Sequence, residues 1–169
     1  MQMFEQREGE VALAGDPASE ANDARLAFIG RIRSPWKRRE DCPKNMDAAR
    51  EKGGGATVMV EVPYRAGLAG LGGFSHVVVL SWFAQAPRNL IVQKPRHATE
   101  AKGVFALRSP ARPNPVGLHV AAIVALDVEA GTIELDAIDA LDGTPVIDLK
   151  PYFASVDAFP DATRPTKEA

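Results

Sequence analysis

Short apolar runs, separated by Gly and Pro, dominate residues 25–153 and constrain the fold most strongly. Most of them alternate in period 2 or are continuous, and Val and Ile are abundant in them, as in short β-strands. The runs are 26–32, 57–62, 76–83, 104–107, 118–128, 132–138 and 146–149. Only 45–52, followed by three glycines, indicates a short helix. About seven strands without alternating helices predict an all-β sandwich or closed barrel.

The least regular segment is 103–118, GVFALRSPARPNPVGL. Its three prolines fix φ and donate no backbone hydrogen bond, so the part that contains them is neither a central strand nor a helix. Arg108, Arg112 and Asn114 stand among these prolines. Such a stiff loop loses little conformational entropy when its side chains bind a ligand. Alternatively, the prolines only shape a corner of the fold and the arginines are solvated.

Length and charge divide the chain into three zones. Its 169 residues suit one domain with a hydrophobic core. Residues 1–24 carry six acids and one base, and we expect a disordered acidic arm there. Residues 25–153 form the expected domain, and 154–169 are expected to be a tail. The net charge is −2, but the charges are unevenly distributed, and the segments 31–52 and 88–112 are basic. These two segments indicate either an anionic partner or a solvated basic face.

Several function classes lack their sequence signals. No apolar run approaches the roughly 20 residues of a membrane helix, and the acidic first residues do not resemble a signal peptide. With a single cysteine, Cys42, this favours a cytoplasmic protein without membrane attachment. The histidines are widely separated, so we expect no metal site. The glycine-rich stretch 67–73 lacks the GxGxxG spacing of a dinucleotide site.

Five distinctive blocks follow one another along the chain: IGRIRSPW (29–36), CPKN (42–45), GLAGLGGFSHVVVLSWF (67–83), GVFALRSPARPNPVGL (103–118) and DALDGTPVIDLKPY (139–152). In this order they resemble the TsaA-like family of tRNA N6-methyltransferases. The resemblance covers about residues 26–153. It implies a single-sheeted closed β-barrel with short peripheral helices that dimerises and binds S-adenosylmethionine. It also implies transfer of a methyl group to N6 of a threonylcarbamoyl-adenosine at position 37 of tRNA.

The resemblance also implies site residues, position by position. The cofactor-binding positions are Asn45, Phe83, Ala84, Arg108, Leu118, Asp136, Ala137, Ile138 and Asp139. Asn45 stands where the family has Gln, and Ala84 stands where many members have His. Arg112, Asn114 and Lys150 are candidates for substrate binding. A strong catalytic base is not required, because the sulfonium of the cofactor already activates the methyl carbon, and we assign none. If a base does assist, Asp139 or Asp142 could serve.

Two alternative functions remain open at this point. The chain could bind S-adenosylmethionine without methylating tRNA, or the barrel could serve as an RNA or protein adaptor without a cofactor. The longer members of the family continue into a small additional domain, whereas here 17 residues follow Tyr152. Substrate recognition could therefore depend on the basic segments and the expected homodimer.

Overall fold

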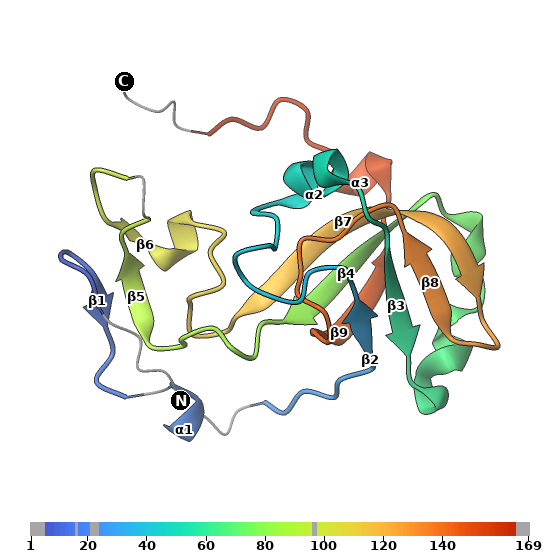
Figure 1. Cartoon of the computed structure of the whole chain (residues 1–169), viewed down its shortest axis with the longest axis horizontal. Coiled ribbons are helices and arrows are strands. Elements are labelled where there is room, and N and C mark those ends of the chain that lie inside the picture. Colours follow the sequence, from blue (N-terminus) through green and yellow to red (C-terminus); the bar gives the residue numbers. More distant parts are fainter. Residues whose placement is uncertain (1–5, 16, 21–23, 96–97, 165–169) are drawn as a thin grey trace.

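The main feature of the structure, a computed structural model that describes residues 6–15, 17–20, 24–95 and 98–164, is a closed antiparallel barrel (Figure 1). Its strands, in order around the barrel, are β2 (Gly30–Arg33), β3 (Ala56–Val60), β8 (Thr132–Leu135), β7 (Val116–Asp127), β4 (His76–Trp82) and β9 (Pro145–Pro151). This confirms the predicted all-β barrel, with six strands in the barrel instead of about seven.

Strand β7 is the longest and pairs with two different strands along its length. Its first part pairs with β4, from Val116 opposite Trp82 to Ala122 opposite His76. Its second part pairs with β8, after a register shift between Ile123 and Ala125. The predicted turn at 127–131 joins β7 to β8, and Gly131 adopts a φ of 74° there, a conformation that favours glycine.

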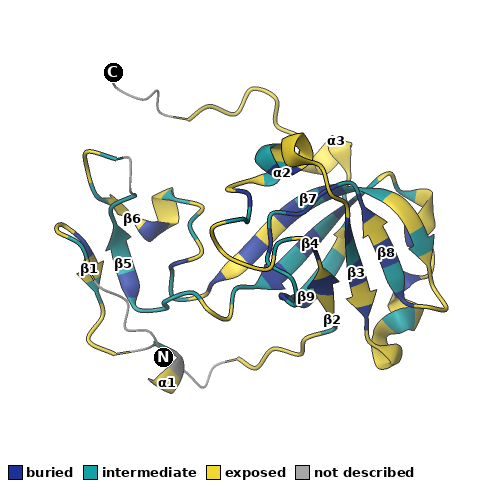
Figure 2. Ribbon diagram, viewed as in Figure 1, coloured by how far each residue is buried: buried dark blue, intermediate teal, exposed yellow. Residues whose placement is uncertain are grey.

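Alternation along the strands places one set of side chains inside the barrel. In β4 every second residue is buried, and β2 and β3 show the same alternation over most of their length. Figure 2 shows these buried positions as dark bands on the strands. The fully buried apolar residues of this core include Ile32, Val58, Val77, Val79, Ile133 and Val146.

Several predicted strand boundaries differ from the structure. Residues 104–107 were expected to form a strand, but Val104–Ala106 is a 3₁₀ helix, which follows the two-residue strand β6 (Lys102–Gly103). The expected strand at 26–32 begins only at Gly30, and Leu26 and Phe28 are exposed. The expected strand at 132–138 ends at Leu135, although Ala137 and Ile138 beyond it are fully buried. Ala137 and Ile138 show that burial does not require strand pairing, so an apolar run can extend past the end of its strand.

A second, three-stranded sheet lies to one side of the barrel in Figure 1. It has the order β1 (Val11–Ala12), β5 (Leu90–Gln93) and β6, and β5 was not among the predicted strands. Residues 11 and 12 belong to the segment expected to be a disordered arm, yet they pair with β5. The buried carboxylate of Glu10 supports this pairing, because it accepts a hydrogen bond of 3.0 Å from the Lys94 amide.

The helices are short and lie around the sheets. The predicted helix is α2 (Met46–Lys52), which Asn45 caps and which ends at Gly53 with a φ of 68°. The others are α1 (Pro17–Glu20), α3 (Ala154–Asp157) and the 3₁₀ helices Val62–Leu68 and Leu71–Gly73. Among the described residues, none of the helices is both long and apolar enough to cross a membrane.

Candidate ligand site

The beginning of β7 brings several of the predicted residues together. Leu118 is half exposed on the outside of the strand, so its side chain offers apolar surface there. Its carbonyl accepts a long hydrogen bond of 3.4 Å from Nη2 of Arg108. The guanidinium of Arg108 is exposed and makes no other hydrogen bond among the described residues, so it retains donors for an anionic group.

The residue after Leu118 points inward and connects two other elements. His119 Nε2 lies 2.8 Å from Oγ of Ser81 on β4, and its Nδ1 lies 2.5 Å from Oδ1 of Asp139. Ser81 and His119 are buried, whereas the Asp139 side chain is 19% exposed. The edge of the Phe83 ring contacts the imidazole, with 5.9 Å between ring centroids. Four residues from the strands and from the link between β8 and β9 thus meet at one end of the barrel.

Asp136 is held by neighbouring parts of the same site. Its Oδ2 lies 2.9 Å from Nε of Arg50, and its Oδ1 accepts a hydrogen bond of 2.8 Å from the Ala122 amide. Burial alone would raise the pKa of Asp136, but the hydrogen bonds from Arg50 and from the amides of Ala122 and Ala137 outweigh it and hold the pKa below its usual value. Asp136 therefore stays ionised and ties α2 to β7.

The remaining predicted cofactor residues offer mainly backbone groups and apolar surface. The side chains of Ala137 and Ile138 are buried, and the Ile138 carbonyl accepts a hydrogen bond of 2.7 Å from the Trp36 indole. Ala84 is exposed, next to Phe83. Asn45 uses its side-chain oxygen to accept the Ala48 amide at 2.8 Å, so in this structure it stabilises the helix.

The loop that links Asn45 to the rest of the site contains Cys42. Burial, together with the negative charge of Asp139, raises the pKa of the Cys42 thiol to about 11. The thiol is therefore protonated and unreactive at neutral pH.

Of the candidate substrate residues, Arg112 has a defined role within its own loop. Its guanidinium donates to the backbone carbonyls of Ser109 at 3.0 Å, Val104 at 2.5 Å and Leu107. These bonds hold the proline-rich segment closed on itself. They explain in physical terms why an arginine stands between two prolines, and they leave a ligand role for Arg112 as a prediction.

Asn114 and Lys150 have partners of their own, away from Arg108. The Asn114 side chain accepts a hydrogen bond of 3.2 Å from Arg88, whose guanidinium also lies over the ring of Trp82. Lys150 is exposed on β9 and forms an ion pair with Asp148 at 2.7 Å. Asn114 is four residues before Leu118, whereas Lys150 is two strands away from β7, so the structure does not group these two residues.

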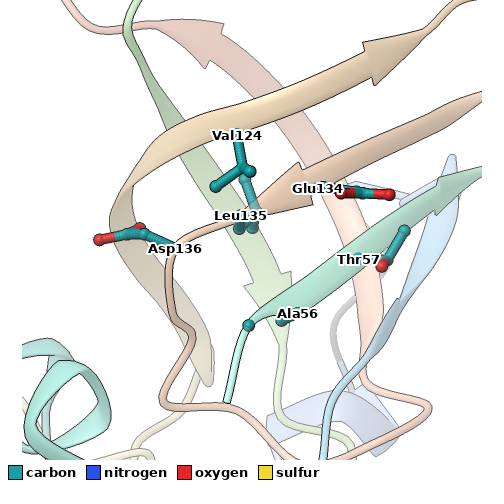
Figure 3. A pocket seen from close by; sticks show the side chains of 7 residues that line it. Ala56, Thr57, Val124, Glu134, Leu135 and Asp136 are labelled. Atoms are coloured by element: carbon teal, nitrogen blue, oxygen red, sulfur yellow. The ribbon is translucent and has the colours of Figure 1, made fainter. Parts of the chain in front are cut away.

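The surface hollows do not coincide with the full set of predicted residues. One, of about 270 Å³, lies over β3, β7 and β8, and of the predicted residues only Asp136 lines it, beside Leu135 and Val124 (Figure 3). Another, of about 410 Å³, is lined by the two 3₁₀ helices 62–68 and 71–73 and by β9, and contains none of them. Because Arg108, Leu118 and Asp139 lie outside both hollows, we locate the site by its side-chain chemistry and its contacts.

Three residues that the sequence prediction missed contact predicted site residues: Ser81 and His119, in series with Asp139, and Arg50, which pairs with Asp136. The alternation along the strands could have indicated Ser81 and His119, because it places Ser81 in the buried series of β4 and His119 in that of β7. Gly117 lies beside both side chains. A Cβ on it would lie 2.3 Å from Ser81 Oγ and 2.7 Å from His119 Nε2, so only glycine fits beside this pair. Within the described part of the chain, no three His, Cys, Asp or Glu side chains gather as metal ligands would.

The structure thus has the architecture of a closed antiparallel β-barrel, and an exposed arginine of the loop before β7, Arg108, is hydrogen-bonded to the carbonyl of the exposed Leu118. Comparison with known families makes this specific: residues 31–158 match the model of the tRNA-methyltransferase O N-terminal domain, and the chain belongs to that family.

Relatives and solved structures agree with this membership. The chain is 37% identical over 145 residues to the "Probable S-adenosyl-L-methionine-binding protein VirR" of Rhizobium radiobacter, covering 86% of this chain and 78% of that protein. It is 33% identical over 141 residues to the tRNA (adenine(37)-N6)-methyltransferase of Escherichia coli, covering 80% of this chain and 60% of the enzyme. The crystal structure of TrmO from Pseudomonas aeruginosa superimposes with a TM-score of 0.69 at 34% identity, covering 86% of this chain and 62% of that one. The chain thus spans about three fifths of the length of these two methyltransferase relatives.

Proposed function

We propose that this chain is an S-adenosylmethionine-dependent methyltransferase that acts on N6 of the modified adenosine at position 37 of tRNA. The observation that carries the proposal is the family match over residues 31–158, within which relatives are named for this cofactor and this reaction. The barrel resembles that of the solved TrmO structure, with a TM-score of 0.69. Two of the predicted cofactor positions, Arg108 and Leu118, share a hydrogen bond at the start of β7, which supports the proposal.

The residues present fit this cofactor. Its carboxylate needs a cationic fork, and Arg108 has unused guanidinium donors. Its adenine needs apolar surface, which Leu118 and Phe83 provide. Its hydroxyl and amino groups need acceptors, and Asp139 has one carboxylate oxygen that receives no hydrogen bond from the described residues.

The cofactor supplies a methyl carbon that its sulfonium already activates toward displacement. The chain's residues then have to bind, orient and shield rather than provide a strong base. Arg108 and Leu118 would fix the two ends of the ligand, and Asp139 would orient a donor between them. The Trp36 indole and Arg50 would keep segment 136–139 in place through Ile138 and Asp136.

For tRNA, we propose that the exposed basic residues of segment 31–52 meet the phosphate backbone. Within the described part of the chain, the ion pairs of this segment involve Lys37, Arg38 and Arg50. The exposed basic residues without such a pair are Arg31, Arg33, Arg39, Lys44 and Lys52. In the other basic segment, 88–112, Arg96 lies outside the described residues.

We further propose that the protein acts as a homodimer in the cytoplasm. Sedimentation analysis of the purified protein would test the homodimer.

Titration calorimetry with S-adenosylmethionine tests the cofactor. Wild-type protein should bind, and Arg108→Ala should weaken binding by roughly tenfold or more, the scale of a lost charge-assisted hydrogen bond. Arg31→Ala is the matched control, because Arg31 is also an exposed arginine with one backbone contact, at 3.2 Å to the Gly143 carbonyl. Absence of binding by the wild type would refute the proposal.

The alternative is a protein that binds the cofactor without methylating tRNA. The VirR relative supports this second candidate, because its name describes S-adenosylmethionine binding and no methyl transfer. This chain covers 78% of that protein. Mass spectrometry of tRNA nucleosides separates the two: a strain lacking the gene should lose the N6-methylated form of the threonylcarbamoyl-adenosine. An unchanged nucleoside profile, with cofactor binding intact, would establish the alternative.

A further inference from the structure

Ser81, His119 and Asp139 form a triad of side chains joined by hydrogen bonds and contributed by three elements. Ser81 Oγ lies 2.8 Å from His119 Nε2, and His119 Nδ1 lies 2.5 Å from Asp139 Oδ1. Ser81 is 0% and His119 2% exposed, so the triad begins in the barrel interior. It reaches solvent only through the Asp139 carboxylate, in the segment that the proposed function assigns to the cofactor.

The chemistry of the three groups fixes the protons. A carboxylate oxygen accepts hydrogen bonds, so the proposal assigns the proton of the His119–Asp139 bond to Nδ1 of His119. In a neutral imidazole the other nitrogen is then an acceptor, and the Ser81 hydroxyl donates to it. Each hydrogen bond orients the next group, and the result is an Asp139 carboxylate with Oδ1 held by His119, while Oδ2 receives no hydrogen bond from the described residues.

A serine, a histidine and an aspartate in series also occur in hydrolases, but this geometry excludes a nucleophilic serine. Ser81 has no exposed surface, and a Cβ placed on Gly117 would lie 2.3 Å from its hydroxyl oxygen. The Phe83 ring lies against the imidazole from the edge. No acyl group could therefore reach Oγ, and attack on a carbonyl requires such an approach.

The buried position of Ser81 and His119 indicates that these two residues act by orienting the exposed member of the triad, Asp139. Burying a hydroxyl and an imidazole is unfavourable unless both are hydrogen-bonded, and apolar residues such as Val77 and Val79 fill the same buried series of β4. The hydrogen bonds of His119 lead from Ser81 to the Asp139 carboxylate, which belongs to the segment that the proposed function assigns to the cofactor.

We propose that His119 and Ser81 are positioning residues. They hold Asp139 so that its second carboxylate oxygen accepts a hydrogen bond from an O–H or N–H group of the bound cofactor. This inference rests on the proposed function, because it assigns the triad to the same cofactor. It adds two residues, neither of which touches the ligand, to the determinants of its affinity.

Two substitutions of His119 separate positioning from packing. His119→Asn keeps an N–H close to the place of Nδ1 and should retain most of the affinity for S-adenosylmethionine. His119→Leu removes both hydrogen bonds and should weaken binding by roughly tenfold, as should Asp139→Asn. Ser81→Ala, a small change that leaves the backbone intact, should weaken binding several-fold. Thermal unfolding of each variant shows which of them are folded, and Ser81→Ala and Asp139→Asn remain informative if His119→Leu is not.

The matched control is the Ser75 and His76 pair at the other end of β4. These side chains also share a hydrogen bond, of 2.9 Å, but no carboxylate follows His76 in the way that Asp139 follows His119. His76→Asn should therefore bind S-adenosylmethionine as the wild type does. Equal binding by wild type and His119→Leu, or equal weakening by His119→Leu and His119→Asn, would overturn the proposal.

Nitrogen-15 NMR of the imidazoles gives a readout that needs neither cofactor nor tRNA. His119 should show the Nδ1-protonated neutral form, and an Nε2-protonated form would overturn the proposal. Failure of the proposed function looks different: the wild type would not bind S-adenosylmethionine at all, whereas failure of the positioning role leaves wild-type binding intact and the His119 variants unaffected.

Discussion

Nε1 of the Trp36 indole donates a hydrogen bond of 2.7 Å to the carbonyl oxygen of Ile138. This bond joins the segment after β2 to the segment between β8 and β9, which are 102 residues apart in sequence. Lys52, at the end of α2, lies with its Nζ 5.4 Å from the centre of the same ring. Trp36 thus fixes the backbone on either side of Asp139.

Replacing Trp36 by Phe keeps most of the apolar surface but leaves the Ile138 carbonyl without this donor. We expect a loss of about 1 kcal/mol in the free energy of unfolding, the scale of one hydrogen bond. Urea denaturation followed by fluorescence of Trp82 measures it. An undiminished stability would show that water replaces the indole without loss.

Arg112 and Arg108 should separate stability from binding. Arg112→Ala removes three contacts to backbone carbonyls and should lower the free energy of unfolding by about 1–3 kcal/mol, because partly buried carbonyls lose a charged donor. Arg108→Ala removes one long bond at an exposed site and should leave the denaturation midpoint nearly unchanged. If Arg112→Ala instead abolished tRNA binding at unchanged stability, the predicted substrate role of Arg112 would be supported over its loop role.

Gly117→Ala should destabilise the barrel, since the added Cβ would collide with Ser81 Oγ, His119 Nε2 and the Phe83 ring. Overpacking of this kind costs about 1–3 kcal/mol. Gly73→Ala is the control, because nothing lies within 4 Å of a Cβ there. In a double-mutant cycle, Ser81→Ala should relieve part of the cost of Gly117→Ala, and strict additivity of the two changes would contradict the described contact.

The Arg50 and Asp136 pair should affect stability in a pH-dependent way. The pKa of Asp136 is lower in the folded protein than its ordinary value of 3.8, so the ionised form stabilises the fold above that pH. This contribution is lost as the pH falls through the lowered pKa. Arg50→Gln should therefore be less stable than wild type at neutral pH, and the difference in the free energy of unfolding should shrink as the pH falls below 3.8 through the lowered pKa.

Arg38→Gln is the control for this measurement. Arg38 also pairs with an aspartate, Asp41 at 2.8 Å, but both side chains are largely exposed. Solvent screens such pairs, so the denaturation midpoint of Arg38→Gln should follow that of the wild type across the same pH range. A pH-independent difference for Arg50→Gln would show that its contact with the Val120 carbonyl, and not the ion pair, carries the effect.

The sequence predicted the barrel because alternation in strands such as β4 is local information, and so is the cap and glycine stop of α2. It did not predict β1 and β5. A two-residue strand such as Val11–Ala12 carries no periodicity, and its pairing with Leu90–Gln93 depends on contacts far apart in the chain. Residues 104–107 looked like a strand because apolar content alone does not distinguish a strand from a 3₁₀ helix.

The site shows the same division between local and distant information. The blocks around Arg108, Leu118 and Asp139 are long and distinctive, so the resemblance placed them in one site. Ser81 and His119 escaped prediction because their meeting requires β4 to pair with β7 in a register that sets Ser81 opposite Gly117. The carbonyl partners of Arg112 were equally hidden, because they depend on how the loop closes.

Strand β7 pairs with β4 along its first part and with β8 along its second part, so we expect the barrel to open as one cooperative unit. The amides of β7 that are hydrogen-bonded to β4 and β8 should then exchange with solvent deuterium only when the closed sheet opens as a whole. The three-stranded sheet has free edges at β1 and β6 and few buried residues, so its amides should exchange through separate, more frequent openings. Breathing motions of the protein are therefore expected to concentrate beside the proline-rich loop, while the strand that carries Leu118 and His119 stays closed.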